Sequence, residues 1–385
     1  MAYKIIQVLE SPLSEIEYKG LDQIRQDIIH RYNPQDIFDM MYLITTDRED
    51  LKINLHDKCV IYYLPQLPDP FHFFNMFIDA IKIARIAKQN DVDLIFSRGV
   101  FFNAVKGVLA GKLSGTRTAV SVLSAYRTNQ QNSGSYYMRF KWLSNFTEKF
   151  VLHLTDHILV YGDSLVKYTL DLGIDAKKIM IENIGVDGNV FYPTDKSESI
   201  KNELSLTDEL IVMYVGRLSK EKLVNYLVDS IPFVLKEVPN TKFVFVGDGP
   251  VKGELIEQCA HLGVQSSVIF CGAKSTNELV KYYNLADFMF YGRGGFTIIE
   301  SALCGKPAVA FDYDRANHLI KHGYNGYITE LNPMAMSKFI ILLLKNNELR
   351  ETLGKNARDE ALTKYTTEVN DSKKAKMFID ILTKR

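Results

Sequence analysis

Short runs of apolar residues alternate with amphipathic stretches along most of the 385-residue chain. The apolar runs predict strands that are buried on both faces of a sheet, and the stretches between them predict the covering helices. Such alternation is typical of parallel, doubly wound α/β domains. In the first half the predicted strands are Lys4–Leu9, Met40–Thr45, Val60–Leu64, Leu94–Ser97, Thr118–Leu123, His157–Tyr161 and Lys178–Glu182. The predicted helices there include Phe74–Gln89 and Tyr136–Leu154.

The pattern restarts after an irregular segment, Asn183–Ser199, which contains Gly185, Gly188 and Pro193. We interpret this segment as the linker between two domains, residues 1–183 and 200–366, because the chain is long enough for two cores. In the second half the predicted strands are Leu210–Val215, Phe243–Val246, Val268–Cys271, Phe288–Tyr291 and Ala308–Phe311. The chain after Pro333 predicts helices at Met334–Lys345, Leu349–Lys364 and Glu368–Thr383.

Composition places the chain among ordinary globular proteins, with 46% hydrophobic and 24% charged residues. Basic and acidic residues balance at 46 each, which argues against a nucleic-acid partner. Residues 82–149 are locally basic, with eleven Lys or Arg against three Asp or Glu, so a local anionic partner is expected.

The four cysteines lie far apart, and the N-terminus runs into a strand without the features of a signal peptide. No apolar run approaches the roughly 18 residues of a spanning helix. A cytoplasmic protein is therefore predicted, and contact with the inner face of a membrane stays open.

The strongest local motif is Tyr214-Val-Gly-Arg-Leu-Ser-Lys-Glu-Lys222, directly after a predicted strand. Ligands of doubly wound sheets bind at the carboxyl ends of strands. Gly216 allows a tight turn there, and Arg217 and Lys222 could neutralise a departing diphosphate, because guanidinium and ammonium groups both bind phosphate oxygens. The alternative is a solvated basic loop, although positive charge at a helix start opposes the helix dipole.

A second motif, Gly292-Arg-Gly-Gly-Phe-Thr-Ile-Ile-Glu-Ser-Ala-Leu-Cys-Gly-Lys-Pro307, follows another predicted strand. Its glycine-rich turn leads into a helix near Thr297, and the backbone amides of such a turn form an anion site. Glu300 has two interpretations. It could close a capping box with Thr297, or its carboxylate could accept hydrogen bonds from ribose hydroxyls.

These motifs together resemble the glycosyltransferases of family 4, a retaining family with the two-domain GT-B fold, also described as glycosyltransferase group 1. The resemblance is carried by Val215–Lys222, Phe245-Val-Gly-Asp-Gly-Pro250, Leu285-Ala-Asp287, Glu300–Val309 and the interdomain Asn183–Pro193. It is specific over residues 150–330, whereas the first 150 residues match only in pattern.

The resemblance implies an α/β, GT-B architecture, in which two doubly wound Rossmann-like domains face a central cleft. The N-terminal domain would bind the acceptor, and the C-terminal domain would bind the nucleotide-sugar. Residues 367–385 would form a C-terminal helix that crosses back to the N-terminal domain. No metal or cofactor is expected, because the nucleotide-sugar, UDP- or GDP-linked, is a co-substrate.

The resemblance also implies residue roles. Arg217 and Lys222 would bind the donor diphosphate and stabilise its departure, and Glu300 would hold the ribose. The remaining donor-binding candidates are Gly216, Gly272, Lys274, Arg293, Gly295, Phe296 and Thr297. The expected reaction is retaining transfer of a sugar to a glycan or lipid-linked acceptor, in the assembly of cell-surface polysaccharide or glycoconjugates.

The sequence departs from the family pattern at three places. Gly292, followed by Arg293, stands where the family usually carries a second glutamate at the donor sugar, so an acidic or modified sugar is conceivable. Glu10-Ser-Pro-Leu-Ser14 replaces the amino-terminal Gly-Gly loop. A frequent histidine is replaced within Leu123-Ser-Ala-Tyr-Arg127, which makes Tyr126 and Arg127 acceptor-side candidates.

Weaker signals favour structural roles. Asp91-Val-Asp93 precedes a strand, on the edge away from the expected site, and Asp312-Tyr-Asp314 follows one. We interpret Asp91 and Asp93 as a solvated turn, and for Asp312 and Asp314 we favour a structural or acceptor-side role over metal binding. A helix-to-strand boundary is expected between His153 and His157, which argues against a metal-binding helix.

The segment Tyr136-Tyr-Met-Arg-Phe-Lys-Trp142 is either an amphipathic helix or a patch that meets anionic lipid or a lipid-pyrophosphate acceptor. Two rival functions also stay open at this point. One is a nucleotide-sugar epimerase or phosphorylase on the same fold. The other is a non-catalytic scaffold that binds nucleotide-sugar beside a partner transferase, which the loss of a glutamate at position 292 keeps in view.

Overall fold

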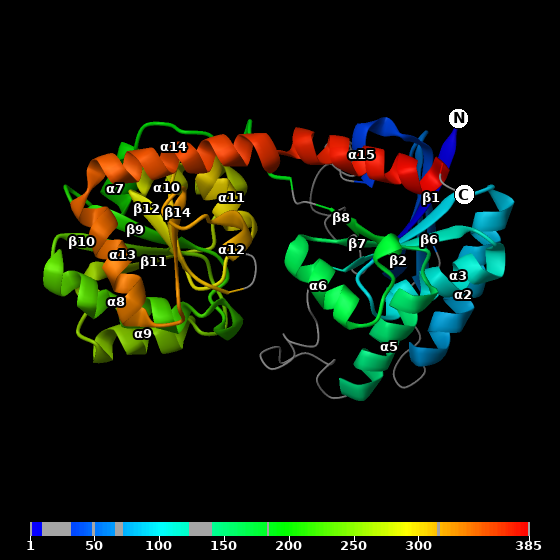
Figure 1. Cartoon of the computed structure of the whole chain (residues 1–385), viewed down its shortest axis with the longest axis horizontal. Coiled ribbons are helices and arrows are strands. Elements are labelled where there is room, and N and C mark those ends of the chain that lie inside the picture. Colours follow the sequence, from blue (N-terminus) through cyan, green and yellow to red (C-terminus); the bar gives the residue numbers. More distant parts are fainter. Residues whose placement is uncertain are drawn as a thin grey trace. The chain divides into compact units, whose positions relative to one another are not determined.

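A computed structural model describes residues 2–9, 32–47, 51–65, 72–122, 141–182, 185–313 and 316–383. The chain folds into two compact units (Figure 1). The first comprises Met1–Asn183 together with Asp371–Arg385, and the second comprises Ile184–Asn370. The last helix therefore begins in the second unit and ends in the first.

The first unit is built on a sheet with the strand order β3-β4-β2-β1-β5-β6-β7-β8. Neighbouring strands are parallel, except that β3 pairs antiparallel with β4 at the edge. The strands are β1 (Tyr3–Val8), β2 (Phe38–Asp47), β3 (Leu51–His56), β4 (Cys59–Pro65), β5 (Leu94–Arg98), β6 (Arg117–Val122), β7 (His157–Val160) and β8 (Ile179–Ile181). Sequence analysis missed β3, because its alternating apolar and polar residues suit a half-exposed edge strand rather than a buried one.

Helices cover both faces of this sheet (Figure 1). They are α2 (His72–Gln89), α3 (Phe102–Ser114), α5 (Lys141–Leu154), α6 (Asp163–Asp171) and α15 (Thr367–Thr383), with short 3-10 turns η2 (Pro34–Asp36) and η4 (Ala176–Lys178). On one face, Phe378 of α15 makes edge-to-face contacts with Phe38 and Phe96, at ring-centroid distances of 5.4 and 5.6 Å. The Arg117 guanidinium donates to the last carbonyls of α15. These contacts fasten the C-terminal helix to the first unit.

The second unit has a wholly parallel sheet with the order β11-β10-β9-β12-β13-β14. Its strands are β9 (Leu210–Val215), β10 (Thr241–Val246), β11 (Val268–Gly272), β12 (Phe288–Tyr291), β13 (Ala308–Phe311) and β14 (Gly326–Thr329). In chain order this is 3-2-1-4-5-6, the arrangement of dinucleotide-binding domains. The five strands predicted for this half are confirmed, and β14 was missed because it is short and includes a glycine.

The helices of the second unit also lie on both sides of its sheet, with α8 and α13 packed side by side (Figure 1). They are α7 (Glu198–Glu203), α8 (Val224–Glu237), α9 (Lys252–His261), α10 (Thr276–Leu285), α11 (Phe296–Leu303), α12 (Ala316–Leu319), α13 (Pro333–Lys345) and α14 (Asn347–Lys364), with 3-10 turns η5 (Lys220–Lys222) and η6 (Gln265–Ser267). Within the described ranges, no helix has the length and apolar character needed to cross a membrane.

Much of the segment interpreted as a linker packs on the second unit. Val186 and Phe191 are buried in its core, and the backbone of Val186 pairs with Thr366. Asn284 accepts a hydrogen bond from the amide of Thr194 at 2.9 Å. The apolar side chains of Val186 and Phe191 pack this irregular stretch on the core of the second unit. Its glycine and proline content did not predict that packing.

Candidate functional site

The two main motifs meet at one place in the second sheet. β9 and β12 are hydrogen-bonded neighbours, and the connections that leave them run to opposite sides of the sheet order. This is the topological switch point, where open α/β sheets bind their ligands. The loop after β9 carries residues 216–223, and the loop after β12 carries residues 292–295.

The loop after β9 lies directly against the loop after β10, backbone against backbone. The amide of Leu218 donates to the carbonyl of Asp248 at 2.9 Å, and the amide of Gly216 donates to Val246 at 3.0 Å. A Cβ on Gly247 would overlap the carbonyl oxygen of Gly216, and one on Gly249 would overlap that of Leu218. The glycines of the Gly-Asp-Gly motif are therefore required because a side chain would separate the two loops.

The loops after β9 and β12 are packed equally closely. A Cβ at Gly292 would overlap the carbonyl oxygen of Lys222 and lie 2.9 Å from the Cβ of Leu223. Leu223 itself has a φ of 57°, a left-handed conformation that costs a side-chain-bearing residue roughly 1 kcal/mol or more. This packing gives a physical reason for the departure at position 292: with Lys222 and Leu223 placed as they are, the backbone leaves no room for a glutamate.

The cations of the first motif differ in their surroundings. Arg217 is exposed, and its guanidinium has no hydrogen-bond or ion-pair partner among the described residues. Lys220, in the same loop, lies 3.4 Å from the carboxylate of Glu254. Lys222 ends the η5 turn whose backbone touches Gly292. The structure therefore brings the backbone of Lys222 to the second motif and leaves the Arg217 guanidinium available at the same edge of the sheet.

Three buried tyrosines of the second unit donate hydrogen bonds to groups at this edge of the sheet. Tyr214 donates to the carbonyl of Arg217 at 2.9 Å, and Tyr291 donates to the carbonyl of Thr297 at 2.9 Å. Tyr283 donates to Glu300 at 2.6 Å. The rings of Tyr214 and Tyr291 are also in contact, with centroids 6.2 Å apart. Each hydroxyl thus fixes one part of the candidate site from the core.

Glu300 does not form the capping box that was one of its two interpretations. The residue before α11 is Gly295, which has no side chain with which to cap the helix. Glu300 instead turns one carboxylate oxygen to Tyr283, while its other oxygen takes no hydrogen bond from the described residues. Burial raises the pKa of this carboxyl, and the Tyr283 hydrogen bond opposes that rise. A free, partly desolvated acceptor oxygen suits the binding of a ligand hydroxyl.

The start of α11 offers backbone donors without a competing acid. There is no acidic residue in the first turn, and its first amides have no acceptor within the helix. A Cβ at Gly295 would meet nothing within 4 Å, so the space above this turn is open. Phe296 is 50% exposed beside it, and Thr297 is half-buried. The Arg293 guanidinium stacks on the Tyr313 ring at 5.1 Å. An anion would fit at this turn.

The remaining donor-side candidates lie at the end of β11. Gly272 has a φ of 70°, and its carbonyl accepts from the amide of Gly247 at 2.8 Å. Lys274 lies 3.5 Å from the carboxylate of Glu203 and 5.2 Å from the Tyr282 ring centroid. Gly272 is therefore hydrogen-bonded to the loop that contains Gly247, whereas Lys274 contacts Glu203 and Tyr282.

The acceptor-side candidates Tyr126 and Arg127 lie outside the described residues, as do Glu10–Ser14 and Asp314. Asp93 accepts a hydrogen bond from the amide of Lys4 at 2.8 Å, and Asp312 accepts one from Asn317 at 3.0 Å. The predicted boundary is confirmed, since α5 ends at Leu154, just after His153, and β7 begins at His157. In the described ranges no three His, Cys, Asp or Glu side chains gather as metal ligands.

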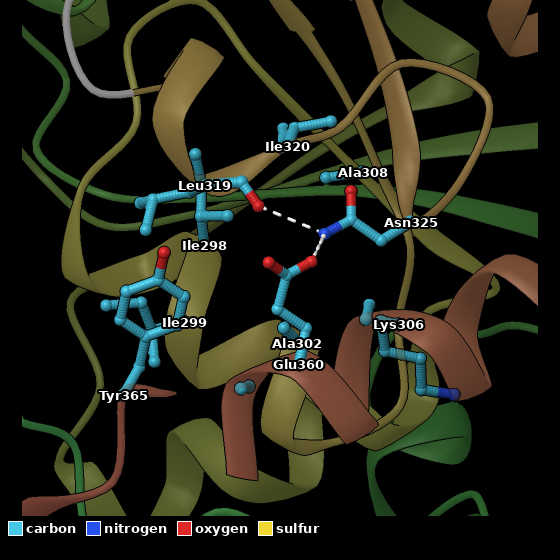
Figure 2. A pocket seen from close by; sticks show the side chains of 12 residues that line it. Ile298, Ile299, Ala302, Lys306, Ala308, Leu319, Ile320, Asn325, Glu360 and Tyr365 are labelled. Atoms are coloured by element: carbon cyan, nitrogen blue, oxygen red, sulfur yellow. Dashed lines mark hydrogen bonds between the residues drawn. The ribbon is translucent and has the colours of Figure 1, made fainter. Parts of the chain in front are cut away.

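A small, mostly apolar cavity lies on the other side of α11, where that helix faces α14 (Figure 2). Asn325 donates to Glu360 at 3.0 Å and to the carbonyl of Leu319 at 3.1 Å. Lys306 points away from Glu360 in this view and donates to the carbonyl of Asn284 at 3.1 Å. Burial lowers the pKa of Lys306 to about 8. This cavity belongs to the packing of α11 and is separate from the open turn at its start.

Sequence reasoning missed the supporting tyrosines. Each stands in an apolar run or helix, where an aromatic residue is ordinarily read as core. The only available signal was that a buried tyrosine usually seeks a partner for its hydroxyl. Which partner it finds depends on the packing of distant segments.

Comparisons with known proteins agree on the kind of protein that this chain resembles. Residues 195–360 match the family model described as "Glycosyl transferases group 1". N-acetyl-alpha-D-glucosaminyl L-malate synthase of Bacillus anthracis is 24% identical over 309 residues, 79% of this chain and 78% of that protein. An Escherichia coli enzyme, UDP-Gal:alpha-D-GlcNAc-diphosphoundecaprenol alpha-1,3-galactosyltransferase, is 20% identical and covers 91% of both chains.

Among solved structures, HepE of Anabaena in complex with UDP superposes with a TM-score of 0.75. It is 18% identical, and the match covers 99% of this chain and 100% of that one. At this identity the likeness concerns the fold alone.

Proposed function

Since the chain is a glycosyltransferase of group 1 with the GT-B fold, we propose that it transfers a sugar, with retention at the anomeric carbon, from a nucleoside-diphosphate sugar to a glycan or lipid-linked acceptor. The observation that carries the donor assignment is the meeting of three elements at the switch point of the second sheet. These are the Arg217 guanidinium, which no described residue pairs with, the Lys222 turn packed on Gly292, and the open start of α11. Together they supply positive charge and backbone donors for two phosphoryl groups.

In the proposed reaction the bond between the sugar C1 and the β-phosphate oxygen breaks. A bond from C1 to the acceptor oxygen forms on the same face, and the acceptor proton passes to the leaving phosphate. Arg217 and Lys222 stabilise the negative charge that develops on the diphosphate. Glu300 accepts from the ribose hydroxyls through the oxygen that Tyr283 leaves free. The protein then needs no nucleophilic side chain of its own.

The first test uses three lysine or arginine variants from one loop. Arg217→Ala and Lys222→Ala should each lower kcat by about 100-fold, because each removes a charged contact to the leaving group. Lys220→Ala is the matched control and should stay near wild type, since Lys220 already faces Glu254. Donor turnover should be followed by nucleotide release, starting with UDP-sugars because HepE was solved with UDP. Near-normal kcat in both variants would contradict the proposal that Arg217 and Lys222 stabilise the departing diphosphate.

The acceptor is the less constrained part of this proposal. The name of the E. coli relative specifies a diphosphoundecaprenol-linked acceptor, which supports testing lipid-linked acceptors first and fits a role in cell-surface polysaccharide assembly. Retention is checked by the anomeric coupling constant of the product in proton NMR. An inverted product, or donor consumption without acceptor as in an epimerase, would contradict this part of the proposal.

We also propose that the first unit contacts an anionic membrane surface. Phe146 on α5 is 62% exposed, and Ile78 and Ile81 on α2 are 48% and 45% exposed. These apolar side chains lie in or beside the basic stretch of residues 82–149, and the combination is typical of interfacial binding. Phe146→Ser should reduce co-flotation with phosphatidylglycerol-containing vesicles and leave the low binding to pure phosphatidylcholine vesicles unchanged. Equal flotation with both vesicle types would argue against it.

A further inference from the structure

The first sheet has its own switch point, and a cation that no described residue neutralises lies there. The order β4-β2-β1-β5-β6-β7 in the first unit repeats the order β11-β10-β9-β12-β13-β14 in the second. β1 and β5 therefore correspond to β9 and β12, and the residues that follow β5 stand where ligands of such sheets bind. β5 ends at Arg98 and is followed by Gly99, which has a φ of 81°.

The Arg98 side chain is held in place but not neutralised. Its guanidinium carbon lies 4.8 Å from the centroid of the Tyr32 ring, and that ring is buried. The Tyr32 backbone is fixed in turn by Gln7, which donates to its carbonyl at 2.6 Å. Arg98 is half-buried, its Nε is buried without a hydrogen-bond acceptor, and no described carboxylate pairs with it. A partly desolvated guanidinium without an anion is unfavourable, so such a group is seldom left unpaired without a ligand.

A second feature points the same way. α3 begins at Phe102, four residues after Arg98, with no side-chain cap and no acidic residue in its first turn. Asn103 and Ala104 in the first turn of this 13-residue helix supply backbone donors, and the helix adds its positive dipole end, on the same side of the switch point. The neighbouring Ser97 does not contribute, because its Oγ is buried against α3 at Gly107.

We propose that Arg98 and the start of α3 form an anion-binding site in the first unit that recognises a phosphate or carboxylate on the acceptor. The planar guanidinium, stacked on Tyr32, can present a two-pronged set of donors to either group. This inference rests on the proposed function, because it takes the first unit to be the acceptor side. It adds that the acceptor is anionic and that Arg98 is the residue that distinguishes an anionic acceptor from a neutral glycan.

The site itself is tested without any assumption about activity. The Nε–Hε resonance of Arg98 is assigned in the full-length protein by its absence from Arg98→Lys, and the protein is titrated with inorganic phosphate. We expect this resonance to shift and saturate, while the resonance of the exposed Arg85 on α2 shifts only with bulk ionic strength. The titration is repeated on the Arg217→Ala protein, in which phosphate binding by the second unit is weakened. The Arg98 resonance should shift as in wild type, because its site lies in the first unit. An Arg98 resonance that moves no more than that of Arg85 would overturn the site.

The acceptor assignment is tested by kinetics at saturating donor. The acceptors compared are a prenyl-diphosphate-linked sugar, a hexose phosphate, a uronic acid and a neutral alkyl glycoside, which separates lipid-borne from soluble anions. Arg98→Gln should raise the KM of the anionic acceptor that is used by about 10- to 100-fold, as expected for a lost charge-assisted hydrogen bond, with little change in kcat. Lys167→Gln removes a positive charge from an exposed position on α6, outside the basic stretch of residues 82–149, and should leave KM unchanged.

The outcomes separate this inference from the proposal beneath it. Equal losses for neutral and anionic acceptors, or a loss in kcat alone, would show that Arg98 has only a structural role. Transfer to no acceptor, together with a saturating phosphate shift at Arg98, would refute the acceptor assignment and leave the anion site standing. Tyr32→Leu, which removes the stacked ring, should reproduce part of the KM effect if Tyr32 positions the guanidinium.

Discussion

The two switch points share a strand order but differ in how they are built. In the second unit, glycine-dependent backbone contacts bind three loops together, and tyrosine hydroxyls fix Arg217, Thr297 and Glu300 from the core. In the first unit, the described part of the edge offers a single stacked arginine and the N-terminus of α3. The difference indicates that the proposed donor site is preorganised by the fold, whereas the described part of the proposed acceptor site supplies charge and little shape.

The largest expected effect tests whether close backbone packing organises the donor side. Gly292→Ala should destabilise the protein by about 2–4 kcal/mol and greatly reduce transfer, because its Cβ meets the Lys222 backbone rather than a movable side chain. Gly295→Ala is the matched control in the same turn, where the backbone is extended and the space is open. It should retain wild-type stability and lose donor affinity. Urea unfolding and nucleotide calorimetry measure the two properties separately.

If both alanine variants lost stability equally, the contrast between a packed and an open glycine would be wrong. If Gly292→Ala retained full stability and activity, the loop after β9 would have to be mobile. In that case the packing reason given for glycine at position 292 would fail as well.

A smaller effect tests the support from the tyrosines. Tyr283→Phe keeps the buried ring and removes the hydrogen bond that opposes the rise in the pKa of Glu300. The pKa of Glu300 should then rise further, so the acidic limb of kcat/KM should move to higher pH. At neutral pH we expect a loss of about 3- to 10-fold, from one hydrogen bond. An unchanged pH profile would exclude Glu300 as an ionised contact to the donor.

The packing of α11 against α14 gives a pH-dependent change in stability of about 1–2 kcal/mol between pH 8 and pH 10. The folded pKa of Lys306 is about 8, below its ordinary value of 10.5, so the unfolded chain binds the proton more tightly. Between these two pKa values, stability should rise with pH, because the unfolded state still holds a proton that the folded state has lost. The free energy of unfolding of wild type minus that of Lys306→Met should therefore become more positive from pH 8 to pH 10. A difference that is constant across this range would contradict the lowered pKa.

The smallest effect compares one arginine at each switch point in the absence of ligand. Arg217→Gln should change stability by less than about 0.5 kcal/mol, because Arg217 is exposed. Arg98→Gln should be neutral or slightly stabilising, since it removes a half-buried charge that no described residue neutralises. Thermal midpoints in a buffer without phosphate or sulfate provide the measurement. Marked destabilisation by Arg98→Gln would mean that its stacking on Tyr32 outweighs the cost of its burial.

Much of the fold was predictable because buried parallel strands leave a strong pattern. The five strands Leu210–Val215, Phe243–Val246, Val268–Cys271, Phe288–Tyr291 and Ala308–Phe311 were placed to within two residues at either end. The half-exposed edge strand β3 and the short β14 carry weaker patterns and were missed. The capping box between Thr297 and Glu300 was a wrong interpretation. The spacing of residues along the chain does not reveal that the Tyr283 hydroxyl binds the Glu300 carboxylate instead.

The sequence by itself determined the fold class, the two motifs and their place after neighbouring strands, since these depend on local patterns of apolar residues, glycine and charge. Only the tertiary structure decided that Gly292 packs against the backbone of Lys222, that three tyrosine hydroxyls donate to Arg217, Thr297 and Glu300, and that Arg98 stacks on Tyr32. The physical reason is that each of these contacts joins segments brought together by the sheet. Their geometry depends on strand order and close packing, which the sequence immediately around a residue does not specify.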